Sequence, residues 1–307
     1  MITASRDFLS MDDVSTAELT GLLNDADEVK RAPETWSTRL QAKQVALIFE
    51  KPSTRTRVSF EVAVASMGGH PIVLRGDELQ LGRGETIEDT GRVLGGYVDA
   101  IAVRTFGQER IERLAESAQV PVINALSDLE HPCQCLADLQ TIRERRGELP
   151  GLVLSYVGDA NNVAHSLMLG GAKAGMNVRI AAPAGYQPLP TVLERSQQLA
   201  RDHGGSVTVL EDASEAATGA DVLYTDVWTS MGQEEEAIQR RTALADYRID
   251  QALVDRADPE VIVMHCLPAH RGEEISADVI DGPRSAVWDQ AVNRLHAQKS
   301  LLGWLLL

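Results

Sequence analysis

The most informative stretch of the sequence is VALIFEKPSTRTRVSF, residues 45–60. Its first five residues are a continuous apolar run, of a length typical of a buried strand. The Pro-Ser pair at 52–53 then predicts a turn and a helix N-cap. Val58 and Val62 recur at helical spacing, until the glycine pair at 68–69 ends the pattern. The stretch therefore predicts a strand, a turn and a helix in immediate succession.

The predicted first turn of this helix has an unusual charge. Helices usually place Asp or Glu there, because the backbone dipole is positive at the N-terminus. This helix instead carries Arg55 and Arg57, with Lys51 just before them and hydroxyl groups in between. Cations beside free backbone N–H groups are favourable when an anion binds among them. The pattern predicts a phosphate site without the glycine spacing of a Walker loop, and the alternative is a solvated basic turn.

Size and composition limit the class of protein. The chain has 307 residues, more than one hydrophobic core usually supports, so two domains are expected. Lys plus Arg total 29 against 45 Asp plus Glu, a formal net charge of −16, which argues against nucleic-acid binding. The N-terminus shows no signal-peptide pattern, and the closing LLGWLLL at 301–307 is too short to span a bilayer. With only three cysteines, we expect a cytoplasmic protein that does not bind membranes.

Strand-like and helix-like segments alternate along the whole chain. This order is typical of mainly parallel sheets with helices on both faces. The predicted strands are 45–49, 71–74, 100–103, 122–126, 152–157, 178–181, 207–210, 221–224 and 261–264, and the predicted helices include 109–118, 133–146, 189–203, 251–257 and about 289–305. We expect two α/β domains, residues 1–147 and 148–288, with residues 289–307 forming a helix that returns to the first domain.

Polar side chains cluster directly after six of the predicted strands. The clusters are residues 51–57, 104–105, 127–134, 158–162, 226–232 and 265–268. Open parallel sheets bind ligands beyond the carboxyl ends of their strands. Since three clusters come from each half of the chain, they predict an active site in a cleft between the two domains.

Four of these clusters carry motifs that resemble one known family. Ser-Thr-Arg-Thr-Arg at 53–57 and His-Pro-Cys-Gln at 131–134 look like the turns of the aspartate/ornithine carbamoyltransferases. Asp226 with Ser-Met-Gly at 230–232, and His-Cys-Leu-Pro at 265–268, are similar to the ornithine-type members. The motifs follow the family order, and the resemblance covers essentially the whole chain.

The resemblance implies a transferase. Its reaction would move the carbamoyl group of carbamoyl phosphate to the side-chain amine of L-ornithine, giving L-citrulline and phosphate in arginine biosynthesis. The neutral amine would attack the carbonyl carbon directly, without a cofactor or a metal. The resemblance also implies a cytoplasmic homotrimer, or an assembly of trimers.

The site residues that the resemblance implies fall into two sets. The set that binds carbamoyl phosphate comprises Ser53, Thr54, Arg55, Thr56, Gln80, Arg104, His131, Gln134, Cys266, Leu267 and Arg294. The set that binds ornithine comprises Asn162, Asp226, Ser230 and Met231. Within the first set, catalytic roles are implied for Arg55, Arg104, His131 and Cys266, and Gln80 is expected to act in the site of a neighbouring subunit.

Other interpretations of these residues stay open. Cys266 is also compatible with a small buried side chain or a covalent nucleophile. Two cysteines at 133 and 135 with His131, His265 and His270 suggest zinc, although their spacing fits no standard finger. A nucleotide-dependent dehydrogenase would need a G-x-G-x-x-G turn, which the turn after residue 157 lacks. A non-enzymatic binding protein, or an enzyme that uses putrescine or an acetylated ornithine as acceptor, are further alternatives.

Overall fold

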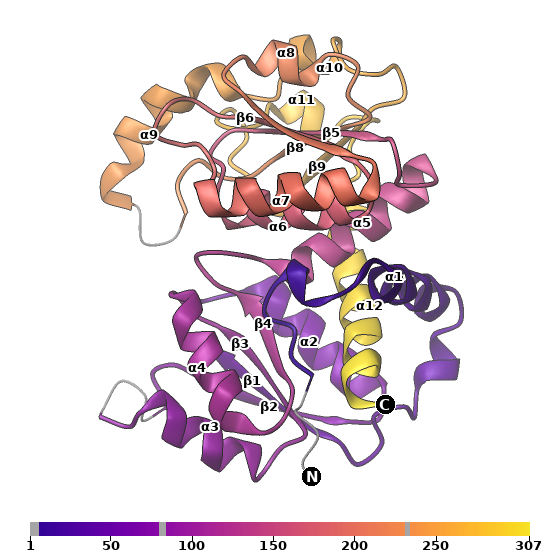
Figure 1. Ribbon diagram of the computed structural model, residues 1–307, viewed down its shortest axis with the longest axis vertical. Helices are drawn as coiled ribbons and strands as arrows, with labels where there is room; N and C mark the ends of the chain where they lie inside the picture. Colours follow the sequence, from indigo (N-terminus) through magenta and orange to yellow (C-terminus); the bar gives the residue numbers. More distant parts are fainter. Residues whose placement is uncertain (1–5, 80–83, 231–233) are drawn as a thin grey trace. The chain divides into compact units, whose positions relative to one another are not determined.

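The computed structural model describes residues 6–79, 84–230 and 234–307 of the chain. The chain divides into two compact units, the first made of residues 1–140 and 293–307 and the second of residues 141–292. The division falls inside two helices, α5 (Pro132–Arg146) and α12 (Val287–Leu306). Each unit contains one parallel sheet with helices beside it, which confirms the predicted α/β class (Figure 1).

A four-stranded parallel sheet forms the centre of the first unit. Its strands are β1 (Gln44–Phe49), β2 (His70–Arg75), β3 (Ala100–Arg104) and β4 (Val122–Leu126), in the spatial order β2-β1-β3-β4. The helices of this unit are α1 (Thr16–Arg31), α2 (Thr54–Ser66), α3 (Ile87–Gly95) and α4 (Gln108–Ala118), with short 3₁₀ turns at Met11–Asp13 and Pro33–Trp36.

The direction of the chain across this sheet reverses between β1 and β3. From β1 the chain passes through α2 to β2 on one side, and then returns through α3 to β3 on the other side. Right-handed crossovers therefore place α2 on one face and α3 and α4 on the opposite face. Ile111 and Leu114 of α4 accordingly share a core cluster with Ile48 and Ile101 of the sheet. Ligands of such sheets bind beyond the strand ends at the point of reversal.

The second unit is built around a five-stranded parallel sheet. Its strands are β5 (Val153–Val157), β6 (Asn177–Ala181), β7 (Ser206–Leu210), β8 (Val222–Thr225) and β9 (Ile262–His265), in the order β7-β6-β5-β8-β9. Its helices are α6 (Asn162–Lys173), α7 (Pro190–His203), α8 (Ala213–Ala217), α9 (Ala237–Leu244), α10 (Gln251–Val254) and α11 (Ala277–Ile280), with 3₁₀ turns at Glu234–Glu236 and Ala245–Tyr247.

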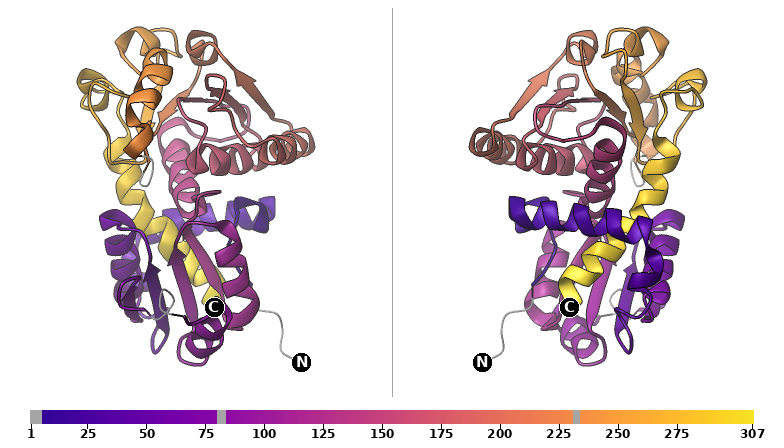
Figure 2. Two further views of the ribbon diagram at one scale, coloured as in Figure 1. Left: turned by 90° about the vertical axis from the view of Figure 1, so that its left-hand side faces the viewer. Right: turned by 90° about the vertical axis from the view of Figure 1, so that its right-hand side faces the viewer.

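This second sheet has the same kind of reversal, here between β5 and β8. The crossovers through α6 and α7 run one way and that through α8 runs the other way. Figures 1 and 2 show α6 and α7 along one face of the sheet, and Figure 1 shows α8 and α10 on the opposite face. The point of reversal lies between the end of β5 and the end of β8, where two of the predicted polar clusters are found.

The nine predicted strands are all present, and their ends differ from the prediction by at most one residue. The predicted helix 251–257 is shorter, because α10 ends at Val254. Helix α2 is present, but the apolar residues that indicated it face outward, since Val58 is 53% and Val62 is 44% exposed. Its buried face instead carries Phe60 and Val64.

The apolar C-terminal segment contributes to the core of the first unit. Leu301 and Leu302 of α12 are fully buried, and a Cβ on Gly303 would lie 2.7 Å from the ring of Trp36. Its apolar character is therefore explained by packing. Within the described ranges we find no helix that is both long enough and apolar enough to cross a membrane.

Candidate functional site

The predicted site residues fall into one group on each unit. The first half-site comprises Ser53, Thr54, Arg55, Thr56, Arg104, His131, Gln134 and Arg294, and the second half-site comprises Asn162, Asp226, Ser230, Cys266 and Leu267. Gln80 and Met231 lie outside the described residues. The expectation that the two half-sites meet in a cleft stays a prediction.

The first half-site begins at the N-terminus of α2. The side chain of Ser53 caps the helix by accepting the N–H of Thr56 at 3.2 Å, and the first turn contains no acidic residue. Arg55 is half-buried and makes no side-chain hydrogen bond or ion pair with another described residue. The guanidinium and the first N–H groups of α2 together form an environment that favours an anion.

The other two cations of this turn have acidic partners. Nζ of Lys51 lies 2.5 Å from Oδ1 of Asp128 and 4.2 Å from the centre of the Phe106 ring. Nε of Arg57 lies 2.6 Å from Oε1 of Glu61, one turn further along α2 on its exposed side. Of the three cations predicted to surround an anion, Arg57 is therefore directed away along the helix.

Arg104 is the last residue of β3 and only 7% exposed. The pairing of β3 with β4 shifts at this position, since Val103 is opposite Asn124 but Arg104 is opposite Leu126. Such an irregularity changes the direction of a strand-end side chain and is common beside active sites. The local backbone thus places a buried guanidinium at the point where the chain direction in the sheet reverses.

Arg294 of α12 joins three elements of the first half-site. Its Nη1 donates to Oε1 of Gln134 on α5, and its Nη2 donates to Oγ1 of Thr56 on α2, each at 2.8 Å. The amide of Gln134 is fixed at its other end as well, because Nε2 donates to Oδ1 of Asp138 at 2.8 Å. The side chains of Arg294, Gln134 and Thr56 are almost completely buried. Hydrogen bonds to a buried charged group fix side-chain orientation strongly.

His131, at the start of α5, is the titratable group of the first half-site. Burial and, after it, the positive charges of Arg294 and Arg104 hold the pKa of the His131 imidazole well below its usual value. The ring is therefore neutral at physiological pH, and one of its nitrogens carries a proton. A neutral imidazole beside two guanidinium groups can donate a hydrogen bond to a substrate oxygen without adding a charge.

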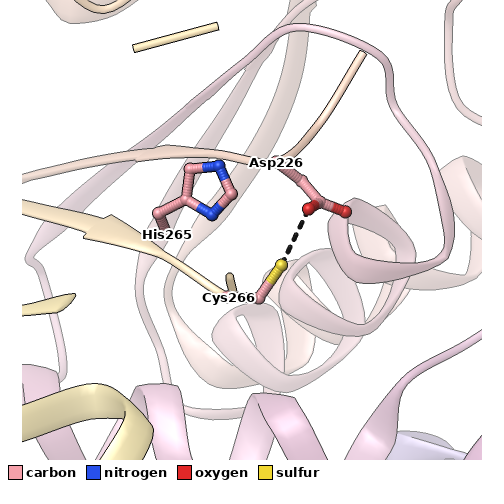
Figure 3. Close-up of side chains that lie close together, drawn as sticks. All are labelled: Asp226, His265 and Cys266. Carbon is pink, nitrogen blue, oxygen red and sulfur yellow. Dashed lines mark hydrogen bonds between the residues drawn. The ribbon is translucent and has the colours of Figure 1, made fainter. Parts of the chain in front are cut away.

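The second half-site is organised around the carboxylate of Asp226, which follows β8. Its Oδ1 accepts the N–H of Val227 and the thiol of Cys266, each at 2.8 Å, and its Oδ2 accepts from Nδ2 of Asn161 at 2.7 Å. Figure 3 shows Asp226 and Cys266 directed toward each other from the ends of β8 and β9, with His265 beside them. Asp226 is only 7% exposed, and these three hydrogen bonds fix the orientation of its carboxylate.

Asn161 is a residue of this half-site that the sequence did not identify. Its Oδ1 caps α6 by accepting the N–H of Val163 at 2.9 Å, which leaves Nδ2 to face Asp226. The adjacent Asn162, which was predicted, is the first residue of α6. The Asn-Asn pair after a strand is itself an N-cap signal, so the first of the two was open to prediction as a cap.

The backbone at Trp228, two residues after Asp226, contacts a largely buried ion pair. Nη1 of Arg240 donates to Oδ2 of Asp159 at 2.7 Å and to the carbonyl of Trp228 at 3.2 Å. Burial raises the pKa of Asp159, and the charge of Arg240 acts in the opposite direction. The ion pair connects the loops after β5 and β8, the two strands between which the chain direction reverses.

The hydrogen bonds of Cys266 argue against a covalent nucleophile. Its thiol donates to a carboxylate, whose negative charge disfavours a thiolate. His265 is not positioned as a base, because its Nδ1 accepts the N–H of Leu267 at 2.9 Å and its Nε2 lies 3.1 Å from Oε1 of Glu274. Neither ring nitrogen of His265 is therefore available for the Cys–His pair by which a thiol is commonly activated.

Two groups of side chains have the composition of a metal site. The donor atoms of Asp226, His265 and Cys266 lie within 4.8 Å of one another, as do those of His270, Glu273 and Glu274. In the first group the thiol and both ring nitrogens already have hydrogen-bond partners that a metal would have to displace. In the second group Glu273 is paired with Arg241 at 3.2 Å. The geometry therefore gives no particular support to a metal at either place.

Comparison with known proteins identifies relatives along the whole chain. Residues 6–144 match the family model described as the carbamoyl-P binding domain of aspartate/ornithine carbamoyltransferase, and residues 150–305 match its Asp/Orn binding domain. The chain is 58% identical over 305 residues to an ornithine carbamoyltransferase of a Parafrankia species, covering 98% of this chain and 96% of the relative. It is 53% identical over 307 residues to that of Rhodococcus opacus, covering 100% and 98% of the two chains.

Solved structures agree with the sequence relatives. The ornithine carbamoyltransferase of Pyrococcus furiosus is similar with a TM-score of 0.95 and 51% identity, covering 99% of this chain and 97% of that one. The enzyme of Giardia lamblia is similar with a TM-score of 0.91 at 34% identity, covering 99% of both. The resemblance predicted from the motifs is confirmed.

Proposed function

Because the chain belongs to the aspartate/ornithine carbamoyltransferase family, we propose that it transfers the carbamoyl group of carbamoyl phosphate to the side-chain amine of L-ornithine. The products are L-citrulline and phosphate. The proposal is carried by the more than 50% identity to ornithine carbamoyltransferases over nearly the full chain. The chemistry of the two half-sites is suited to these substrates.

The first half-site binds the phosphate of carbamoyl phosphate. Arg55 and Arg104 grip the dianion, because guanidinium groups match phosphate oxygens bidentately. The first-turn N–H groups of α2 and the hydroxyls of Ser53 and Thr54 supply further donors. Support comes from the lack of an acidic residue in the first turn and from the absence of an acidic partner for Arg55 among the described residues.

The carbonyl oxygen of the carbamoyl group is stabilised by Thr56 and His131. Oγ1 of Thr56 accepts from Arg294, so its own proton is available to a substrate oxygen, and the adjacent guanidinium strengthens that donor. The imidazole of His131 is neutral and donates in the same way. Negative charge grows on this oxygen as the amine attacks, and the loss of one such donor typically lowers the rate by about 10²- to 10³-fold. Gln134, held by Arg294, binds the carbamoyl amide.

The second half-site binds the amino-acid end of ornithine. The carboxylate of Asp226 pairs with the α-ammonium, and Asn162, Ser230 and Met231 orient the rest of the amino acid. Cys266 and Leu267 complete the carbamoyl phosphate site, which requires the two half-sites to meet. The ordered carboxylate of Asp226 supports an acceptor with a free α-ammonium over an acetylated ornithine, whose α-nitrogen carries no charge.

The attacking amine is neutral in this mechanism. The side-chain ammonium of free ornithine resembles that of Lys, with a pKa of about 10.4. The reactive form therefore grows as the pH rises, and we expect the rate at limiting ornithine to increase through pH 7–9. When the C–N bond forms, the C–O bond to phosphate breaks, and the nitrogen gives up one proton. The phosphate departs with the electron pair of the C–O bond and takes up this proton, so that it is released as the hydrogen phosphate dianion.

The assembly and cellular place of the enzyme follow the family. We infer a cytoplasmic homotrimer, or an assembly of trimers, that serves arginine biosynthesis, with Gln80 donated to the site of a neighbouring subunit. No cofactor and no metal takes part in the steps described above. Analytical ultracentrifugation tests the trimer, and a protein that stays a monomer at micromolar concentration would contradict it.

One assay tests the activity. Purified protein is incubated with carbamoyl phosphate and L-ornithine without added metal or nucleotide, and citrulline is measured. Putrescine and an acetylated ornithine are offered at equal concentration in the same reaction, so that acceptor preference is read directly. Citrulline as the main product is the expected result. Carbamoyl putrescine or a carbamoylated acetyl-ornithine as the main product would change the acceptor, and no carbamoylated product at all would refute the proposal.

A further inference from the structure

We propose that Glu274 is a positioning residue of this reaction, acting through His265 on the turn that carries Cys266 and Leu267. The inference rests on the proposed function, because that turn belongs to the second half-site. Neither Glu274 nor its contact with His265 was indicated by the sequence motifs.

The contact between the two side chains is fully buried. Nε2 of His265 lies 3.1 Å from Oε1 of Glu274, and neither side chain has any exposed surface. The same Oε1 accepts the backbone N–H of His270 at 2.5 Å. Glu274 thereby connects the end of β9 with the residues beyond the turn, on both sides of Cys266 and Leu267.

The hydrogen bonds of His265 determine its tautomer. Nδ1 accepts the backbone N–H of Leu267 at 2.9 Å, so this nitrogen carries no proton. The proton of the neutral ring is therefore on Nε2, where it is donated to Glu274. A carboxylate that accepts from one ring nitrogen fixes which nitrogen is protonated and how the ring is oriented. Glu274 in this way keeps Nδ1 available to the backbone of the turn.

The turn needs such support, because Leu267 has a φ of +60°. This left-handed region is disfavoured for a residue with a Cβ. Backbone in an unfavourable conformation persists only where the surroundings hold it, and such positions are common at functional sites. The hydrogen bond from the N–H of Leu267 to Nδ1 of His265 stabilises the turn in this conformation.

The backbone of His265 has a separate anchor. Its N–H donates to Oε1 of Gln290 at 2.9 Å, and Nε2 of Gln290 donates to the hydroxyl of Tyr224 at 2.9 Å. Because β9 is held there independently of Glu274, loss of the carboxylate should release the ring and the turn more than the strand. This separates a positioning role from a purely structural one.

A carboxylate at this place is costly for the fold. Oε2 of Glu274 is buried without a hydrogen bond among the described residues, and it lies 3.9 Å from Nδ1 of His270. A buried charge with so few partners is unfavourable. Glutamine would keep an acceptor for His265 at lower desolvation cost. The carboxylate is therefore better explained by the strength of its hydrogen bond to the imidazole than by a contribution to the stability of the fold.

The test uses two single variants, the double variant and one matched control. Glu274→Ala removes the link, and His265→Asn keeps an acceptor near the position of Nδ1 while it breaks the contact with Glu274. The double variant combines them. Glu273→Ala removes a neighbouring carboxylate that pairs with Arg241, whereas the carboxylate paired with His265 is that of Glu274, and it serves as the control. Citrulline formation is measured with each substrate varied in turn, together with the melting temperature.

We expect Glu274→Ala to lower kcat/KM by about 10- to 100-fold, the range for a lost hydrogen bond to a charged group. Glu273→Ala should retain the wild-type value. In the His265→Asn background, Glu274→Ala should have no further effect, because its action passes through the ring. An equal loss in both backgrounds, or a lowered melting temperature with kcat/KM unchanged, would overturn the proposal.

A spectroscopic measurement separates this proposal from the proposed function. The ¹⁵N chemical shifts of the His265 imidazole distinguish the protonated nitrogen from the other one, in the protein without substrates. We expect a single Nε2–H tautomer in the wild type and in Glu273→Ala, and a mixture in Glu274→Ala. An unchanged tautomer in Glu274→Ala would refute the positioning role even if citrulline is formed. A wild type that forms no citrulline would refute the proposed function instead.

Discussion

Asp226→Asn removes one negative charge from the second half-site with almost no change in shape. The carboxylate accepts three hydrogen bonds, from Val227 and Cys266 on one oxygen and from Asn161 on the other. An asparagine has one acceptor oxygen, so its NH₂ group would face at least one of these donors and form no hydrogen bond with it. Asn161 cannot turn to relieve this, because its Oδ1 caps α6.

Two magnitudes follow from this geometry. A buried donor left without an acceptor costs about 1–3 kcal/mol in the free energy of unfolding. For the substrate, the loss is that of one partner of a largely buried charge pair, about 2–5 kcal/mol. At about 1.36 kcal/mol per factor of ten, kcat/KM for ornithine should fall about 30- to 5,000-fold. The affinity for carbamoyl phosphate should stay unchanged, because Asp226 does not belong to the phosphate-binding residues.

The assay measures initial rates of citrulline formation with ornithine varied at saturating carbamoyl phosphate, and calorimetry measures carbamoyl phosphate binding. Asp212→Asn is the matched control, since this exposed aspartate caps α8 and asparagine caps equally well. It should keep both the kinetics and the unfolding free energy. A value of kcat/KM for ornithine within threefold of wild type in Asp226→Asn would refute the assignment of the α-ammonium to this carboxylate.

Three further predictions concern the first unit. Arg55→Ala should lower the rate at least about 10²-fold with little change in unfolding free energy, because the side chain has no partner among the described residues. A citrulline assay with a thermal melt checks both quantities, and near-normal turnover would exclude Arg55 from the phosphate site. The His131 imidazole should not titrate in NMR spectra between pH 6 and 8, and Arg294→Gln should raise its pKa, because the charge of Arg294 lowers that pKa more than the charge of Arg104 does. Since the unfolded state is protonated first, this histidine lowers the free energy of unfolding as the pH falls through about 6.5. An ordinary His131 titration in the wild type would contradict the assignment. Burial raises the pKa of Asp7 to about 6, so between about pH 4 and 6 the folded state holds a proton that the unfolded state has lost, and the unfolding free energy decreases as the pH rises. Asp7→Asn keeps an acceptor for the N–H of Val122 and should remove that decrease in denaturant melts. An unchanged dependence of the unfolding free energy on pH would show that another group is responsible.

The strands and the half-sites were predictable because their signals are local. A parallel strand buried on both faces is a short continuous apolar run, and the residues after it lie at the edge where such sheets bind ligands. These local signals are sufficient to predict that Arg55, Arg104, His131, Asp226 and Cys266 lie at strand ends or just beyond them. Burial on two faces also explains why the predicted ends of inner strands such as β1, β3, β5 and β8 were so close to those observed.

The contacts that fix the orientation of these side chains were not predictable in the same way. Arg294 binds Thr56 and Gln134 from 238 and 160 residues away, and no local pattern encodes those pairings. The pair of Arg57 with Glu61 was open to prediction, because residues four apart share a helix face. The exposed Val58 and Val62 show the limit of periodicity, which detects a helix but does not say which apolar residues face the core.

The charges of the two half-sites bear on how the substrate amine loses its proton. The first half-site gathers Arg55, Arg104 and Arg294 on a chain whose net charge is −16, and these cations suit a dianion and its departing phosphate. The second half-site presents one carboxylate whose oxygens are held by Asn161 and Cys266. A carboxylate held in this way, and paired with the α-ammonium, does not move to pair with the side-chain ammonium and therefore does not stabilise its protonated form. Under the proposed function, the cations of the first half-site favour the neutral form of the reacting nitrogen and therefore its attack on the carbonyl carbon.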